Sequence, residues 1–137
     1  MNLKLFFKLS FLLILFLISI KNPHAYSASI EMPEITSINT APYEIKKQWV
    51  CLPNNKGELH ITVTTKNTSK IKIWITPTGT NQWKNRKLLI ADNLNNNKYT
   101  YRWKYQSDYI LNHIVIKVFS STGEQDSSSF NVINHCK

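Results

Sequence analysis

One short segment places an aromatic ring beside three cations: Trp83 is followed by Lys84, Arg86 and Lys87. Residues 78–87 are polar and lie between two apolar runs, which predicts an exposed loop. A tryptophan beside cations can stack on a sugar or an apolar group while the lysines and arginine attract negative charge. The segment therefore predicts a binding site for a glycan, an anionic wall polymer or an acidic protein. The structural alternative is a tryptophan that folds back to cap an open end of the fold.

A second aromatic and basic group is expected on one face of neighbouring strands. Trp74 and Lys72 alternate with isoleucines, so they point outward if the isoleucines fill the core. Phe119 and Val115 are expected to project outward on a neighbouring strand, beside Lys117. Such a face suits an anionic polymer or a partner protein. The alternative is an outer face that only shields the sheet, with lysine stems lying over the rings.

Residues that typically carry catalysis are sparse. After the first 27 residues the histidines are His60, His113 and His135, and no nucleophile elbow, zinc-protease motif or phosphate-binding glycine loop occurs. Asp92 and Asp108 would form a carboxylate pair only if the fold brought them together, and both adjoin turns, where Asp commonly caps backbone groups. We therefore expect no enzyme, no cofactor and no metal.

The two cysteines, Cys51 and Cys136, lie 85 positions apart. In an exported chain such a pair predicts a single disulfide, and closing so long a loop stabilises a fold by about 4 kcal/mol. The alternative is a metal site made of both cysteines, His135 and another histidine. That site lacks the CxxC or HxxxH spacing typical of zinc ligands.

The first 27 residues predict a secretory signal peptide. Two lysines precede the run 9–20, which holds twelve residues without a charge, whereas a membrane-spanning helix needs about 20. Small residues favour cleavage after Ser27, with Ala25 as the weaker position. The alternative is an uncleaved anchor. Export would place the protein outside the cell, in the periplasm or at the envelope, with no membrane span after cleavage.

The charge is positive and unevenly distributed. Cleavage after the predicted signal removes three lysines and no acid, so the remaining 110 residues keep a formal charge of +6 out of +9. All of their basic residues follow Glu44. Such a chain binds anionic surfaces in a salt-dependent manner. Export and the scattering of the cations argue against nucleic acid as the partner, and the sequence does not indicate an oligomeric state.

Strict alternation of apolar and polar residues dominates the chain after the predicted signal. It predicts seven or eight short strands, at residues 35–38, 46–52, 58–64, 71–76, 88–90, 99–105, 114–119 and 129–132. Polar turns separate them, and no stretch keeps a helical period. This spacing predicts an all-β antiparallel sandwich formed by a single domain, residues 28–137, in which 28–43 is an extended tail or an edge strand.

One predicted strand carries a row of alternating aromatic residues. Tyr101 and Trp103 are expected to fill the interior of the sandwich, and Tyr105 is expected at its rim. A sugar-stacking platform is the alternative reading of the row that begins at Tyr99.

From Pro33 onward the chain resembles bacterial immunoglobulin-like domains. The resemblance rests on residues 33–38 (PEITSI), 71–75 (IKIWI), 99–103 (YTYRW), 114–123 (IVIKVFSSTG) and 127–132 (SSSFNV). It implies an immunoglobulin-like sandwich whose last strand runs beside its first, so that a Cys51–Cys136 bond would clip the opening strands to the end of the chain. Trp49 to Leu52 and the cysteine near the end depart from the family pattern. Such modules generally bind or space rather than catalyse.

These observations predict a secreted, non-catalytic binding or adhesion module that contacts an anionic envelope polymer, a glycan or an extracellular protein. A secreted effector or inhibitor of a host or competitor protein is the second hypothesis. A small secreted hydrolase is the third.

Overall fold

The computed structural model describes residues 31–79 and 83–136, without the side chain of Trp83. The predicted signal peptide, residues 1–27, lies outside the described residues. The described chain forms eight strands and one 3-10 turn: β1 (Glu34–Ala41), β2 (Trp49–Leu52), β3 (Lys56–Lys66), β4 (Lys70–Pro77), η1 (Trp83–Asn85), β5 (Lys87–Asn93), β6 (Lys98–Gln106), β7 (Leu111–Phe119) and β8 (Gln125–Asn134). No helix within these ranges is long and apolar enough to cross a lipid bilayer.

Each of the predicted strands is present, although most are longer than the alternation indicated. The exception is the run 46–52, of which only the second half is a strand. Lys47 and Gln48 adopt positive φ angles of 49° and 67°, which no extended strand accommodates. The chain therefore turns at these two residues, and β2 begins at Trp49.

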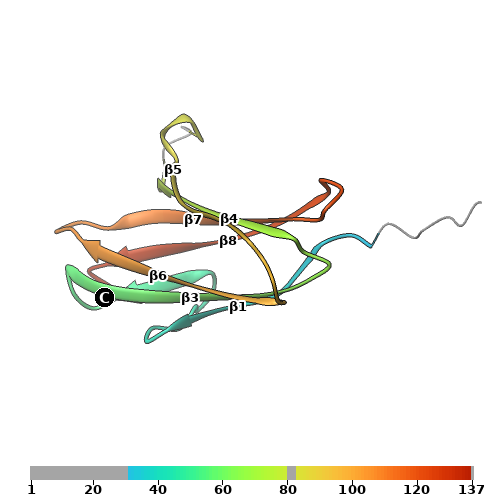
Figure 1. The fold of residues 1–137 in the computed structure, drawn as a ribbon. Coiled ribbons are helices and arrows are strands. Elements are labelled where there is room, and N and C mark those ends of the chain that lie inside the picture. Colours follow the sequence, from blue (N-terminus) through green and yellow to red (C-terminus); the bar gives the residue numbers. More distant parts are fainter. Residues whose placement is uncertain (1–30, 80–82, 137) are drawn as a thin grey trace, which may run out of the picture. The chain divides into compact units, whose positions relative to one another are not determined.

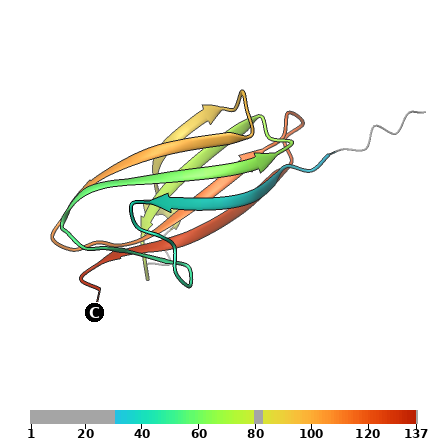
Figure 2. The same cartoon turned by 90° about the horizontal axis from the view of Figure 1, so that it is seen from below.

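The strands form two sheets that pack face to face. One sheet has the order β1-β3-β6 and the other the order β2-β8-β7-β4-β5. Figure 1 views them edge-on, with β4, β7 and β8 in the upper layer and β1, β3 and β6 in the lower one. Figure 2 looks onto the smaller sheet, where β1, β3 and β6 lie side by side. The described residues thus form an all-β sandwich, as the alternation predicted.

The core lies between the sheets and is built from the inward-pointing residues of each strand. Its buried members are Val50, Leu52, Leu59, Ile61, Val63, Ile71, Ile73, Trp103, Tyr105, Ile110, Ile114, Ile116, Val118, Phe130 and Val132. The side chains of β7 illustrate the pattern, because Ile114, Ile116 and Val118 are wholly buried. Burial of this apolar surface is the main force that holds the sheets together.

The prediction that Tyr105 lies at the rim is wrong. Its side chain is buried, with 6% of its surface exposed. The cause is Gly57, the residue directly opposite in β3. A Cβ atom at Gly57 would lie 2.6 Å from the Tyr105 hydroxyl, so only glycine leaves room for the ring to turn inward. Trp103 is buried and Tyr101 half-buried, in the positions predicted for them.

One strand pairing differs from the predicted antiparallel arrangement. β2 runs parallel to β8, with Val50 opposite Val132 and Cys51 opposite Ile133. The first strand, β1, pairs with β3 instead, so the strand that lies beside the last one is the second. β1 still contacts β8 at one point, where the Ile35 N–H donates to the Asp126 carboxylate at 2.8 Å. Alternation along a strand carries no information on direction, so this parallel pair was not predictable from it.

A disulfide closes the end of the parallel pair. It joins Cys51 to Cys136, whose Cα atoms lie 6.0 Å apart, and it spans 85 positions. The predicted pairing is therefore confirmed, and the alternative metal site made of these cysteines is wrong.

Beside the disulfide, a buried asparagine connects three segments. The Asn134 side-chain oxygen accepts a hydrogen bond from the Ile110 N–H at 2.7 Å. Its amide group donates to the side chain of Asn55 at 3.2 Å and to the carbonyls of Ser107 and Asp108 at 3.3 and 3.2 Å. Asn134 thus provides a partner for the N–H of the buried Ile110 and connects two carbonyls of the β6–β7 loop to β8.

Removing the disulfide should destabilise the protein strongly. We expect the Cys51→Ser/Cys136→Ser variant to lose about 4 kcal/mol of unfolding free energy, because the unfolded chain is then no longer cross-linked. Urea unfolding followed by circular dichroism measures this loss. Reductant should reproduce it in the native protein and have no effect on the double variant; equal stability of both proteins would contradict the prediction.

Truncation of the buried asparagine provides a second test of this end of the fold. Asn134→Ala should cost about 3 kcal/mol, because it leaves the buried Ile110 N–H without a partner and removes the hydrogen bonds to two loop carbonyls. The matched control is Asn95→Ala, at an exposed position, for which we expect a change within about 0.5 kcal/mol. Equal urea midpoints for the two variants would show that Asn134 does not hold the loop.

Candidate functional site

The strand register fixes which side chains share the outer face of the five-stranded sheet. Residues directly opposite each other in neighbouring strands point to the same side. The rows on this face are Leu88, Trp74, Val115 and Ser129; Ala91, Lys72, Lys117 and Ser127; and Asn93, Lys70, Phe119 and Gln125. Trp74, Lys72, Lys117 and Phe119 therefore share one face, on two adjacent strands.

Lys72 lies between two aromatic rings on this face. Its ammonium nitrogen is 5.4 Å from the centroid of Phe119 and 6.0 Å from that of Trp74. A cation at this distance from an aromatic ring is attracted by the negative face of the ring. The two rings therefore restrain a flexible lysine while its charge is kept.

Arg86, one residue of the predicted loop site, contacts an aromatic ring of the same face. Its guanidinium carbon lies 5.5 Å from the centroid of the Trp74 ring. Lys84, in η1, and Lys87, at the start of β5, are exposed beside it. The Trp83 side chain lies outside the described residues. Arg86 of the predicted loop site thus joins the predicted sheet-face group through Trp74, whereas Lys87 lies opposite Ile75 in the strand register. We call Lys70, Lys72, Trp74, Arg86, Lys117 and Phe119 the cationic face.

Val115 lies on the outer side of its strand, as predicted, but it does not contribute exposed surface. Only 9% of its side chain is exposed. It lies directly opposite Trp74 in the register, so the larger neighbouring side chains cover it. Val115 therefore lies beside Trp74 as a buried neighbour and is not part of a contact surface.

Like charges face each other across this sheet. Lys72 lies directly opposite Lys117 in the antiparallel pair β4–β7. Like charges in such positions repel and cost free energy. None of the residues in the three described rows is Asp or Glu. A bound anion would therefore relieve repulsion at this position.

Asp92, the acid of the edge strand β5, does not lie on the outer face of the sheet. Asp92 in β5 pairs with the inward-facing Ile71. Burial raises the pKa of Tyr99, and a hydrogen bond and negative charge from Asp92 raise that pKa further. The Asp92 carboxylate thus interacts with a tyrosine of the smaller sheet.

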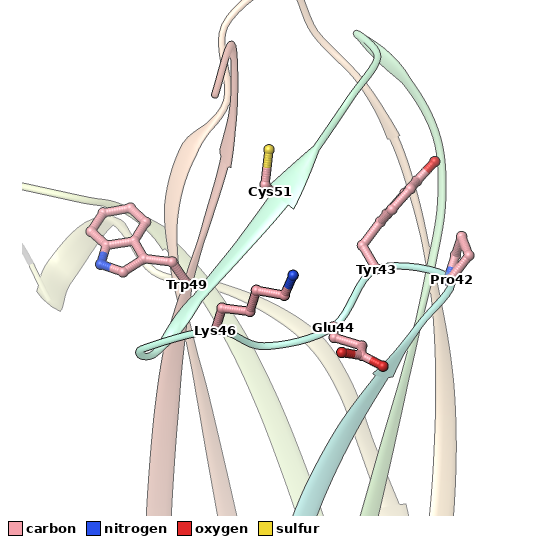
Figure 3. Close-up of a pocket in the computed structure, with 6 residues that line it drawn as sticks. All are labelled: Pro42, Tyr43, Glu44, Lys46, Trp49 and Cys51. Atoms are coloured by element: carbon pink, nitrogen blue, oxygen red, sulfur yellow. The ribbon is translucent and has the colours of Figure 1, made fainter. Parts of the chain in front are cut away.

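A depression lies at the crossing from β1 to β2. Pro42, Tyr43, Glu44, Lys46, Trp49 and Cys51 line a volume of about 430 Å³. In Figure 3 the rings of Trp49 and Tyr43 lie on opposite sides of β2. Glu44 and Lys46 bring opposite charges to the same rim. Rings so placed do not form a common stacking platform, and the mixed charge does not select an anion or a cation.

The histidines have structural partners. His113 is hydrogen-bonded to the Asn131 side chain at 2.8 Å, His60 to Glu58 at 2.5 Å and His135 to the Asp108 carbonyl at 2.7 Å. Within residues 31–79 and 83–136, no group of three His, Cys, Asp or Glu side chains is arranged to hold a metal ion.

Lys70 of the cationic face and Asn93, which lies opposite it in the register, were not among the predicted site residues. Lys70 precedes Lys72 by two residues, so the alternation already placed both on one face. The contribution of Asn93 depends on the pairing of β5 with β4, which no local pattern shows.

The contact between Arg86 and Trp74 should be measurable as a coupling energy. In a double-mutant cycle with Arg86→Gln and Trp74→Leu, we expect a coupling of about 0.5–1 kcal/mol in unfolding free energy. The control cycle pairs Trp74→Leu with Lys104→Gln, which lies on the other sheet, and should be additive. Equal coupling in both cycles would show that Arg86 does not interact specifically with the ring.

The comparisons with known proteins concern the fold alone. No protein-family model matches the chain, and no curated protein matches it in sequence. Among solved structures, the superoxide reductase (neelaredoxin) from Ignicoccus hospitalis is similar, with a TM-score of 0.52 and 8% identity over 77% of this chain and 81% of that one. At this identity, the likeness supports the two-sheet β architecture and carries no information on activity.

Proposed function

We propose that this chain is a secreted, non-catalytic, immunoglobulin-like module that binds an anionic extracellular polymer through the cationic face. The observation that carries the proposal is the restraint of two cations, Lys72 and Arg86, over aromatic rings on one sheet face.

The strand topology supports the immunoglobulin-like part of the proposal. Constant-type immunoglobulin sandwiches have seven strands, A to G in chain order, with A, B, D and E in one sheet and C, F and G in the other. Here β1, β3 and β6 form one sheet, and β4, β7 and β8 form the centre of the other. β5 extends that sheet in the manner of variable-type domains, and β2 continues the first strand onto the edge of β8.

Export is supported by the disulfide and by the predicted signal peptide. Stable disulfides are typical of proteins that leave the reducing cytosol. The described residues contain no free cysteine.

Restrained cations favour binding over a merely shielded sheet. Ordering a lysine on association costs free energy, because its side chain has many rotamers. Lys72 and Arg86 are already positioned against rings, so part of that cost is met before an anion arrives. The Lys72–Lys117 repulsion adds a further gain on anion binding.

A polymer fits this face better than a small ligand. The cations are spread over β4, β7 and the residue between η1 and β5 rather than converging on one point. Side chains two residues apart on a strand are spaced by about 6.6 Å, so several charges of an extended polyanion can be contacted at once.

The test compares two triple variants that lose the same charge. Lys72→Gln/Arg86→Gln/Lys117→Gln removes three cations from the cationic face, and Lys98→Gln/Arg102→Gln/Lys104→Gln removes three exposed cations from the outer face of the smaller sheet. Binding to purified anionic cell-wall polymer is measured by sedimentation at fixed ionic strength.

We expect the first variant to bind at least about tenfold more weakly, since each cation near an anionic surface contributes on the order of 1 kcal/mol. The second should change binding by less than about threefold, through net charge alone. Equal losses would show that total charge, and not this face, determines binding. Absence of binding by the parent protein would overturn the polymer as ligand.

A further inference from the structure

We propose that a depression beside the β7–β8 turn is a subsite for a single phosphate group, and that the polymer of the proposed function is a linear phosphodiester. This inference rests on the proposed function, because the depression adjoins the cationic face. We call it the hairpin pocket.

The hairpin pocket is formed by three strands and one turn. Its lining residues are Ser69, Lys70, Lys72, Asn93, Phe119, Ser120, Ser121, Thr122 and Gly123, and its volume is about 650 Å³. Lys70 lies directly opposite both Phe119 and Asn93 in the strand register. The pocket therefore occupies the last row of the outer face, where the β7–β8 turn forms its wall.

Hydrogen bonds within the turn hold this wall in place. The Ser120 hydroxyl accepts hydrogen bonds from the N–H groups of Thr122 and Glu124 at 3.2 and 3.1 Å. The hydroxyls of Ser120 and Thr122 both donate to the Glu124 carboxylate. Gly123 adopts a φ of 101°, which closes the turn. The wall is thus organised before any ligand binds.

The charge of the lining is positive. Lys70 and Lys72 contribute two ammonium groups, and no lining residue is Asp or Glu. Glu124, the acid of the turn, is directed at the Ser120 and Thr122 hydroxyls, and these hydrogen bonds lower its pKa. Neither lysine makes an ion pair with a carboxylate within the described ranges.

The arrangement of the donors suits a tetrahedral anion. Lysine binds phosphate as a compact charge, without the fixed fork by which arginine pairs with carboxylate and phosphate alike. The pocket has two lysines from β4, and Asn93 of β5 and the exposed Ser121 of the β7–β8 turn also line it. Donors that come from several directions suit the oxygens of a tetrahedral anion.

Lys72 connects the pocket to the rest of the face. It lines the pocket and also lies against the rings of Phe119 and Trp74. A polymer chain with one phosphate group in the pocket would therefore place its next charged groups near Lys117 and then near Arg86. This continuity favours a linear polymer over an isolated anion.

The experiment compares two single variants on two polyanions of equal charge. Lys70→Gln removes a cation that lines the pocket, and Lys117→Gln removes one that lies on the face outside it. Affinities of the disulfide-bonded, exported protein are measured by fluorescence anisotropy for labelled deca(glycerol phosphate) and for labelled decaglutamate, at the same ionic strength.

We expect Lys70→Gln to weaken binding of the phosphodiester about tenfold and binding of decaglutamate less than about twofold, because only phosphate uses the pocket. Lys117→Gln should weaken binding of both to a similar extent. Ser121→Asp, at an exposed position, should repeat the selective loss by placing a carboxylate in the pocket. Lys70→Arg should restore only part of the affinity.

Two results would overturn the inference while leaving the proposed function intact. In the first, Lys70→Gln and Lys117→Gln weaken the binding of both polyanions to the same extent. In the second, the parent protein binds decaglutamate more tightly than deca(glycerol phosphate). Vesicles of phosphatidylglycerol serve as the other phosphodiester source: Lys70-dependent binding to vesicles without binding to deca(glycerol phosphate) would overturn the polymer. Failure of the two triple variants to differ would instead count against the proposed function itself.

Discussion

The burial of one side of β7 is the constraint on which the site depends. Ile114, Ile116 and Val118 are wholly enclosed between the sheets, and β7 lies between β4 and β8. Because successive side chains of a strand point to opposite faces, Lys117 and Phe119 must then lie outside. A register shift of one residue would bury the lysine and expose the isoleucines, at a cost of several kcal/mol. The position of the cationic face therefore follows from the packing of the core beneath it.

The same constraint explains how much of the structure was predictable. Alternation located every strand and the outward direction of Trp74 and Lys72, since both depend only on neighbours along the chain. It could not show that Arg86 lies over Trp74, because that contact joins the residue between η1 and β5 to β4, and no local pattern connects the two. The parallel β2–β8 pair was missed for a similar reason. The inward turn of Tyr105 depends on the glycine opposite it, in another strand.

Cation–ring attraction and apolar packing both stabilise the outer face of the larger sheet. A sheet face with Lys72 opposite Lys117 pays for their repulsion, and the rings of Phe119 and Trp74 offset part of that cost by attracting the Lys72 charge. Val115 lies directly opposite Trp74 on β7, so Trp74 has an apolar neighbour as well as cations beside it. The face is thus stable without a ligand while its cations keep their charge.

The covalent bond between Cys51 and Cys136 also determines how the module responds to mechanical force. Six of the eight strands, β3 to β8, lie between the two cysteines. When the chain is pulled from the N-terminal side and from Cys136, tension passes through the sulfur atoms and bypasses these strands. Only β1 and the segment leading to β2 can be extended. The cationic face lies wholly inside the bypassed loop, so tension applied between the N-terminal side and Cys136 does not pass through it.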